Sequence, residues 1–116
     1  MGTYYTTARD RLADVQDLAV GELAKRTVLV DDDRKRVSHF HFRPGEETGW
    51  HKHEYDYFVV YLTDAKLLHM PRGGQEVLLE HRIRDSRAIP AGVEHNVRCL
   101  SAHDVELLEV EYKTPV

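Results

Sequence analysis

Residues 36–62 read R-V-S-H-F-H-F-R-P-G-E-E-T-G-W-H-K-H-E-Y-D-Y-F-V-V-Y-L, and this stretch decides the class of fold. It begins and ends with short runs rich in aromatic and β-branched residues, at 36–42 and 57–62. Pro44-Gly45 and Gly49 lie between the two runs, and such residues are typical of the turns and loops that join strands. The stretch therefore predicts two β-strands connected by a loop.

The same pattern continues on both sides of this stretch. Further β-rich runs occupy residues 27–30, 66–70, 76–83, 88–89, 95–100 and 105–112. The sequence P-R-G-G at 71–74 predicts a hairpin, and D-D-D-R at 31–34 predicts a tight turn. Because no gap between these runs can hold a crossover helix, a parallel βαβ sheet is disfavoured. The pattern predicts an all-β sandwich or barrel over residues 27–116.

Residues 1–26 are predicted to form an N-terminal arm. Leu12, Val15 and Leu18 lie near one face at a loosely helical spacing, and Gly21 would end such a helix; an extended arm is the alternative. The core of the barrel is expected from apolar strand residues: Val28, Val30, Phe40, Phe42, Val60, Leu62, Leu67, Val77, Leu79, Leu108 and Val110.

Composition excludes several classes of protein. The 116 residues suffice for one domain, and 41% hydrophobic with 31% charged residues is typical of a globular chain. The longest apolar run, residues 57–62, is too short for a membrane helix, and residues 1–10 do not resemble a secretory signal. The single cysteine, Cys99, cannot form an intrachain disulfide, which favours a reducing, cytoplasmic location. A net charge of -4 gives no reason to expect nucleic acid or an anionic membrane as a partner.

Eight histidines in so short a chain indicate metal chemistry. His51 and His53 stand two residues apart, so on an extended chain their side chains point to the same face. His95 follows the rigid turn Pro90-Ala91-Gly92. Three imidazoles from two segments can bind a divalent transition metal and leave coordination positions open.

These two segments resemble the paired motifs of the cupin superfamily. Residues 45–53 match the opening of the first motif, G-x5-H-x-H-x3–4-E-x6-G, and residues 90–95 match the centre of the second, G-x5-P-x-G-x2-H-x3-N. The sequence H-x-H-E-Y-D-Y, followed by L-T-D, is most similar to small bacterial cupins associated with beta-alanine degradation. The resemblance implies an antiparallel jelly-roll barrel, the double-stranded β-helix, which supplies the metal ligands from its interior.

The sequence departs from the first motif at its glutamate. That position falls at 57 or 58, which are Tyr57 and Phe58, and Cys99 replaces the closing asparagine of the second motif. Glu54 and Asp56 are nearby carboxylates, but strand alternation does not place Glu54 beside the histidines, and Asp56 would need a bulge to reach them. The expected ligand set is therefore His51, His53 and His95.

The other histidines are not expected to bind the metal. His39 and His41 also stand two residues apart, but the alternating phenylalanines make the better core face, so these histidines should point outward. His69, His81 and His103 have no partner at ligand spacing.

Three neutral imidazoles leave a divalent ion with its charge of +2, so a small anionic metabolite such as a carboxylate is the expected ligand. Tyr57 either lines the cavity and binds this ligand or packs on the outer sheet, because the two possible motif spacings give opposite answers. No residue stands out as a catalytic base, and the metal could be Fe, Zn, Ni or Mn.

Two kinds of function follow from the resemblance. The first is an enzyme, with dioxygenase-like chemistry on iron, or isomerase-like or lyase-like chemistry on zinc, nickel or manganese. The alternative is a non-catalytic ligand-binding or dimerisation cupin with a relic metal site. Small cupin barrels commonly pair, which implies a homodimer.

Overall fold

Strand-forming residues build nine β-strands and no helix in residues 22–114, the part of the chain that the computed structural model describes. The strands are β1 (Lys25–Asp31), β2 (Lys35–Phe42), β3 (His51–Lys52), β4 (Asp56–Tyr61), β5 (Ala65–Pro71), β6 (Val77–His81), β7 (Ser86–Ile89), β8 (Glu94–Cys99) and β9 (Val105–Tyr112). Each β-rich run predicted from the sequence overlaps one of these strands. The two-residue strand β3 is the one that the sequence analysis did not predict.

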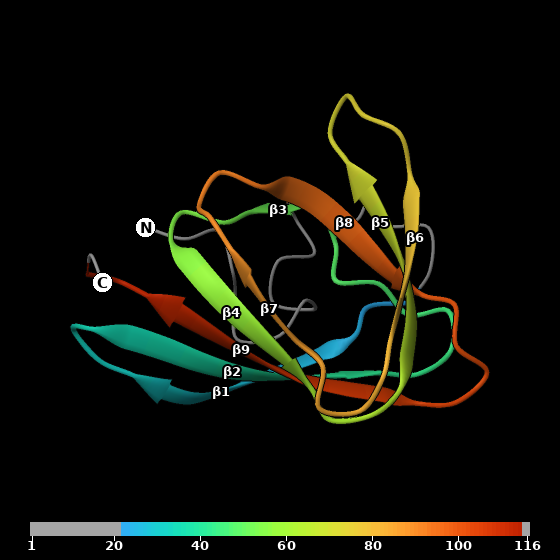
Figure 1. Cartoon of the computed structure of the whole chain (residues 1–116), viewed down its shortest axis with the longest axis horizontal. Helices are drawn as coiled ribbons and strands as arrows, with labels where there is room; N and C mark the ends of the chain where they lie inside the picture. The colour runs from blue at the N-terminus through green and yellow to red at the C-terminus, as the bar shows by residue number, and fades with distance from the viewer. Residues whose placement is uncertain (1–21, 115–116) are drawn as a thin grey trace.

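The strands pair into two antiparallel sheets that face each other (Figure 1). One sheet has the order β1-β2-β9-β4-β7 and the other has the order β3-β8-β5-β6. This is the antiparallel jelly-roll fold that the sequence predicts. Strands β7 and β6 are edge strands of the two sheets, and the loop of residues 82–85 joins them.

The tight turns lie where turn residues occur in the sequence. After β1, the Asp32 carboxylate accepts hydrogen bonds from the backbone N–H groups of Arg34 and Lys35, at 2.8 and 2.9 Å. At the tip of the β5–β6 hairpin Gly73 has φ +72°, a conformation that other residues rarely adopt. The predicted hairpin at 71–74 is thus confirmed.

The N-terminal helix predicted around Leu12, Val15 and Leu18 lies outside the described residues. The first strand begins earlier than predicted. Strand β1 begins at Lys25, two residues before the expected boundary between arm and barrel, and Leu23 forms an isolated bridge to Glu47.

The core lies between the two sheets and differs in part from the predicted one. Its buried hydrophobic residues are Ala24, Phe40, Phe42, Tyr57, Val59, Tyr61, Ala65, Leu67, Val97, Cys99, Val105 and Leu107. Phe40, Phe42 and Leu67 were predicted correctly. Cys99 is free and fully buried, as a small core residue.

The prediction of the core was wrong for the inward faces of β4 and β9. Val59 and Leu107 are buried, whereas Val60, Leu108 and Val110 are half-buried on the opposite face. Cross-strand register explains this, because Val60 lies opposite Leu108 and the two belong to the same face.

Further predicted core residues lie at the surface. Val30, Leu62 and Val77 are 40%, 38% and 46% exposed, and Val28 and Leu79 are half-buried. A β-bulge between Val28 and Val30 shifts the register of β1, so the simple alternation assumed for this strand fails.

The inward face of β9 also buries two carboxylates that the sequence analysis did not expect there. Glu109 and Glu111 are 4% and 0% exposed. Arg36 binds both carboxylate oxygens of Glu111 through two hydrogen bonds of 2.9 and 3.1 Å. The Arg26 guanidinium lies 3.6 Å from the same carboxylate. Such pairing stabilises a charge that would be very costly to bury alone.

Candidate metal centre

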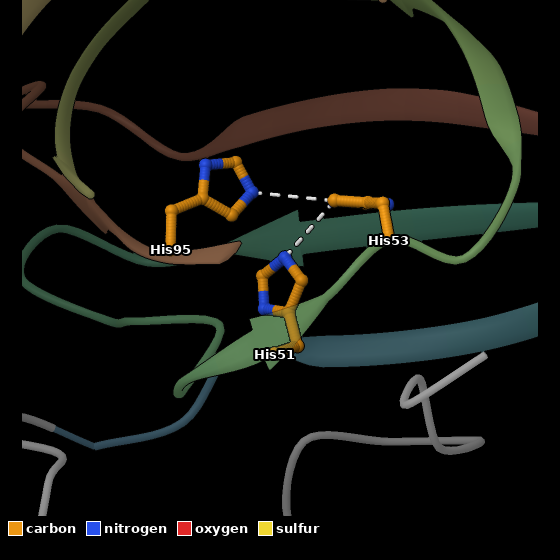
Figure 2. A group of neighbouring side chains, drawn as sticks. All are labelled: His51, His53 and His95. Atoms are coloured by element: carbon orange, nitrogen blue, oxygen red, sulfur yellow. Dashed lines mark hydrogen bonds between the residues drawn. The ribbon is translucent and has the colours of Figure 1, made fainter. Parts of the chain in front are cut away.

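The pairing of β3 with β8 brings the predicted histidines together. His51 lies directly opposite His95 in the antiparallel register, and His53 follows two residues later. All three side chains are buried, with exposures of 3%, 1% and 7%. Figure 2 shows their rings converging from two separate segments of the chain.

The Nε2 atoms of the three histidines meet at one point. The Nε2 atom of His53 lies 3.1 Å from that of His51 and 3.2 Å from that of His95 (Figure 2). Three ligands bound about 2.1 Å from one ion, at octahedral or tetrahedral angles, are roughly 3.0–3.4 Å apart. The donor set and its spacing therefore fit a first-row transition metal.

A backbone contact fixes how His51 presents its ring. The Nδ1 atom of His51 lies 2.8 Å from the carbonyl oxygen of Gly49, so Nδ1 carries the proton and donates it to this oxygen. The Nε2 atom is then the unprotonated one, with its lone pair toward the other two rings. Gly49 has φ +83°, a backbone conformation that residues with a side chain rarely adopt.

The turn before β8 holds His53 in place through its backbone. The N–H of Gly92 donates to the carbonyl of His53, and the N–H of His53 donates to the carbonyl of Val93, both at 2.8 Å. The Asp56 carboxylate in turn accepts a hydrogen bond from the N–H of Ala91 at 2.8 Å. Asp56 therefore supports the turn and is not part of the group formed by the three histidines.

A buried polar network positions the loop that leads to His51. The Asn96 side chain accepts a hydrogen bond from the N–H of Gly49 at 3.0 Å and donates one to Glu47 at 2.8 Å. The Nε atom of Arg98 donates to the other oxygen of Glu47 at 2.8 Å. This network fixes residues 47–49 against β8, so the approach of His51 to His95 is built into the fold.

Burial keeps the histidines in the form that binds metals. Desolvation lowers the pKa of His53 to about 2, and electrostatic interactions with the His95 ring and with the charge of Arg26 act in the same direction. Desolvation also lowers the pKa of His95 to about 3, with a further contribution from His69. Both rings are neutral at physiological pH, as metal ligands must be.

Tyr57, one of the two positions at which the cupin motif would have its glutamate, lies beside His53. Its ring stacks on the His53 ring with the centroids 3.9 Å apart. Tyr57 is buried and faces inward, whereas Phe58 faces outward and Glu54 is exposed. Burial raises the pKa of Tyr57, with a further contribution from Glu109, so the phenol stays protonated and can donate a hydrogen bond.

A cavity of about 40 Å³ adjoins the histidines between the two sheets. His53 and His95 lie on its wall, together with Tyr57, His69, Arg87 and Glu109. Because one water molecule needs roughly 10–15 Å³ of such space, about three water molecules fit, and this small volume favours a short ligand.

The structure brings His69 into this cavity, although the sequence analysis assigned no role to it. The His69 ring centroid lies 5.6 Å from that of His95. Its Nε2 atom is buried and has no hydrogen-bond partner in the described part of the chain. One signal could have found it, because His69 shares the parity of the predicted core residue Leu67.

Glu109 is the second site residue that the sequence analysis missed. One oxygen of Glu109, one of Glu111 and a ring nitrogen of His53 lie within 4.8 Å of one another. This second group is a poor metal site, because Glu111 is already bound by Arg36. His39 and His41 point away from the cavity and lie 2.9 and 2.8 Å from the carboxylates of Glu106 and Asp104.

Comparison with known proteins finds one curated relative and several solved structures that resemble this chain. No family model matches the chain. A curated protein of Pseudomonas aeruginosa, named beta-alanine degradation protein BauB, is 46% identical over 88 residues, which cover 75% of this chain and 90% of that protein.

Two solved structures extend the comparison. A cupin domain from Bordetella pertussis is 38% identical with a TM-score of 0.77, and the match covers 81% of this chain and 97% of that one. A cupin superfamily protein from Desulfitobacterium hafniense is 17% identical with a TM-score of 0.63 and 83% coverage of both chains, which supports the fold alone. Within residues 22–114, no helix has the length and apolar character needed to cross a membrane.

Proposed function

Because the chain belongs to the cupin superfamily, we propose that it is a metal-binding cupin acting on a small anionic metabolite at His51, His53 and His95. The observation that supports this most directly is the convergence of the three Nε2 atoms. A divalent Fe, Zn, Ni or Mn ion held there would act as a Lewis acid and, in the case of iron, could also activate oxygen.

A short carboxylate is the proposed ligand. Three neutral imidazoles leave the charge of the ion uncompensated, which favours an anion in the remaining coordination positions. The small volume of the cavity favours a short ligand. The name of the Pseudomonas aeruginosa relative points to beta-alanine, a short amino acid that carries a carboxylate. Tyr57 is proposed to bind this ligand, because its protonated phenol lies beside His53.

The metal content of purified protein tests the proposal. Elemental analysis of protein prepared without a metal-affinity column should find a bound transition metal, and His51→Ala, His53→Ala and His95→Ala should each remove it. Glu54→Gln, Asp56→Asn and His41→Ala are matched controls and should keep it, since these side chains do not face the site. Metal retained by His95→Ala at the wild-type level would contradict the three-histidine site.

A second candidate function is ligand binding without turnover. The small volume of the cavity and the absence of a glutamate ligand favour it. Incubation of the metal-loaded protein with beta-alanine and short carboxylates, followed by NMR, distinguishes the two. New product signals that depend on His95 support an enzyme, and binding without any product supports the second candidate.

A homodimer in the cytoplasm completes the proposal. The edge strand β1 presents Leu29, which is 56% exposed, and Val30 to its surroundings. An exposed apolar edge strand is a favourable surface for pairing with a second copy. A free buried cysteine agrees with a reducing compartment. Sedimentation of wild type and Leu29→Lys checks the dimer, which the charge should weaken.

A further inference from the structure

The wall of the cavity includes a positively charged side chain, that of Arg87. It belongs to the five-stranded sheet, whereas His51 and His95 belong to the four-stranded sheet. Arg87 lies in the edge strand β7, opposite Val59 of β4, and Ile89 lies opposite Tyr57. Val59 and Tyr57 are both buried, so Arg87 belongs to the inward face of the sheet, while Ser86 alternates to the outside. Arg87 accordingly lines the cavity, although much of the residue is exposed.

The guanidinium of Arg87 acts on groups from both sheets. Burial is the main cause of the lowered pKa of His69, about 4, and the charge of Arg87 contributes next. Burial raises the pKa of Tyr57 and Tyr61, and the charge of Arg87 opposes this increase. Burial is also the main cause of the lowered pKa of His81, and the charge of Arg87 is the second. The position of Arg87 follows from the cavity wall, which it shares with Tyr57 and Tyr61 of β4 and His69 of β5.

The Arg87 side chain forms no hydrogen bond or ion pair with another residue of 22–114. Glu109 lies on the same cavity wall, and Asp85 lies in the adjoining loop. The guanidinium fork of Arg87 is therefore available to an anion that enters the cavity. A planar fork of this kind matches a carboxylate through two parallel hydrogen bonds.

His69 lines the same cavity as Arg87 and lies beside the candidate metal centre. Its ring centroid is 5.6 Å from that of His95, and it shares the cavity wall with Arg87. Its buried Nε2 atom, which has no partner among the described residues, faces the same cavity. A ligand that filled the space from His95 to Arg87 would supply the hydrogen bond that this atom lacks.

We propose that Arg87 and His69 form an anion-recognising end of the cavity, so that the ligand is a short bifunctional acid with its carboxylate on Arg87 and a second donor group at the three histidines. This inference rests on the proposed metal-binding function. The small volume of the cavity favours a ligand with a short chain between its two functional groups.

Malonate is a suitable probe, and malonamide is its neutral counterpart. Calorimetric titration of metal-loaded wild type should show malonate binding, and Arg87→Gln should weaken it at least tenfold, since a hydrogen-bonded charge pair is lost. Arg87→Lys keeps the charge but not the planar fork, so its affinity for malonate should lie between those of wild type and Arg87→Gln. Malonamide should bind wild type and Arg87→Gln equally weakly. His69→Leu should weaken malonate about twofold to tenfold.

Arg82→Gln is the matched control, because it removes the same charge from the exposed loop of residues 82–85. It should change malonate affinity by less than about twofold, as expected for a screened surface charge. All variants should hold the same amount of metal as wild type by elemental analysis. Unchanged malonate affinity in Arg87→Gln at full metal content would overturn the inference, and so would an equal loss in Arg82→Gln.

A second measurement separates this inference from the proposed metal function. In metal-free protein, NMR titration with malonate should shift the Arg87 Nε–Hε resonance before those of other arginines. If wild type holds no metal but this shift occurs, the metal function fails and the anion end stands. If wild type holds metal but Arg87 does not respond in either state, the anion end fails and the metal function stands.

Discussion

At the scale of single residues, the histidine cluster is neutral for a physical reason. Desolvation places the pKa values of His53 and His95 at about 2 and 3, far below 6.5. In the unfolded chain both rings take up a proton near pH 6.5, whereas in the folded protein they do not. Between these values the unfolded state binds more protons, so acid favours unfolding.

This difference predicts the pH dependence of stability in metal-free protein. The free energy of unfolding should decrease as pH falls below 6.5, by about 1.4 kcal/mol per pH unit for each of His53, His95 and His69, whose pKa burial lowers to about 2, 3 and 4. Urea unfolding between about pH 7 and 5 in the presence of a chelator measures this slope. His53→Gln should lower the slope by the contribution of one histidine, about 1.4 kcal/mol per pH unit, whereas His103→Gln, at the surface, should leave it unchanged. An identical slope in wild type and His53→Gln would show that the ring is not buried in neutral form.

At the scale of elements, the turn between β7 and β8 determines where His53 lies. Gly92 has φ +108°, and a Cβ atom there would meet nothing within 4 Å, so the constraint is on the backbone and not on space. Gly73, in the β5–β6 hairpin, has φ +72° and is equally open. The two glycines differ in position, because only Gly92 is hydrogen-bonded to the backbone of His53.

Gly92→Ala and Gly73→Ala should therefore both lower the free energy of unfolding by about 1–2 kcal/mol. Only Gly92→Ala should also weaken metal binding, because a shifted turn displaces His53 relative to His51 and His95. Urea unfolding measures the first effect, and zinc competition against a chromophoric chelator measures the second. Equal zinc affinity in the two variants would mean that the turn does not position the site.

How far the sequence determines these elements depends on how clearly each strand alternates. R-V-S-H-F-H-F alternates cleanly, so its core face, with Phe40 and Phe42, was predicted correctly. Strands β4 and β9 contain apolar residues at both parities, and β9 places Glu109 and Glu111 inward. No single-strand pattern reveals that two buried arginines from other strands meet Glu111, since those contacts depend on the packing of the sheet.

The candidate site, too, was predictable where it depends on local sequence and was not where it depends on the pairing of strands. Local spacing and the Pro-x-Gly turn, together with the resemblance to the two cupin motifs, identified His51, His53 and His95 as neighbours. Their approach within 4.8 Å depends on the register of β3 with β8, which no local pattern states. Arg87 and His69 were missed because each stands alone in the sequence and reaches the cavity only through its pairing with Val59 and Val97.

At the scale of the whole molecule, the core and not the metal should maintain the fold. The buried residues of both sheets form one hydrophobic cluster, and apolar burial contributes about 25 cal/mol per Å². A metal at 100 times its dissociation constant adds only about 2.7 kcal/mol. The site therefore differs from small zinc modules, which unfold without their ion.

Removal of the metal should accordingly leave the β spectrum in circular dichroism intact while lowering the melting temperature. A loss of roughly 4–8 °C per kcal/mol is expected for a domain near this size. His95→Ala should show the lower melting temperature without chelator and should not respond to added metal. A chelated sample without β structure at room temperature would instead make the metal a structural element of the fold.

The position of β9 has a consequence for how the protein is made. This strand, Val105–Tyr112, is the ninth along residues 22–114, yet it lies in the middle of its sheet, between β2 and β4. A ribosome therefore synthesises β2 and β4 before the strand that joins them. The five-stranded sheet cannot close until residues 105–112 have been synthesised and have left the ribosome. A message that stops before residue 105 would yield a chain with two unpaired edges, prone to aggregation and to degradation.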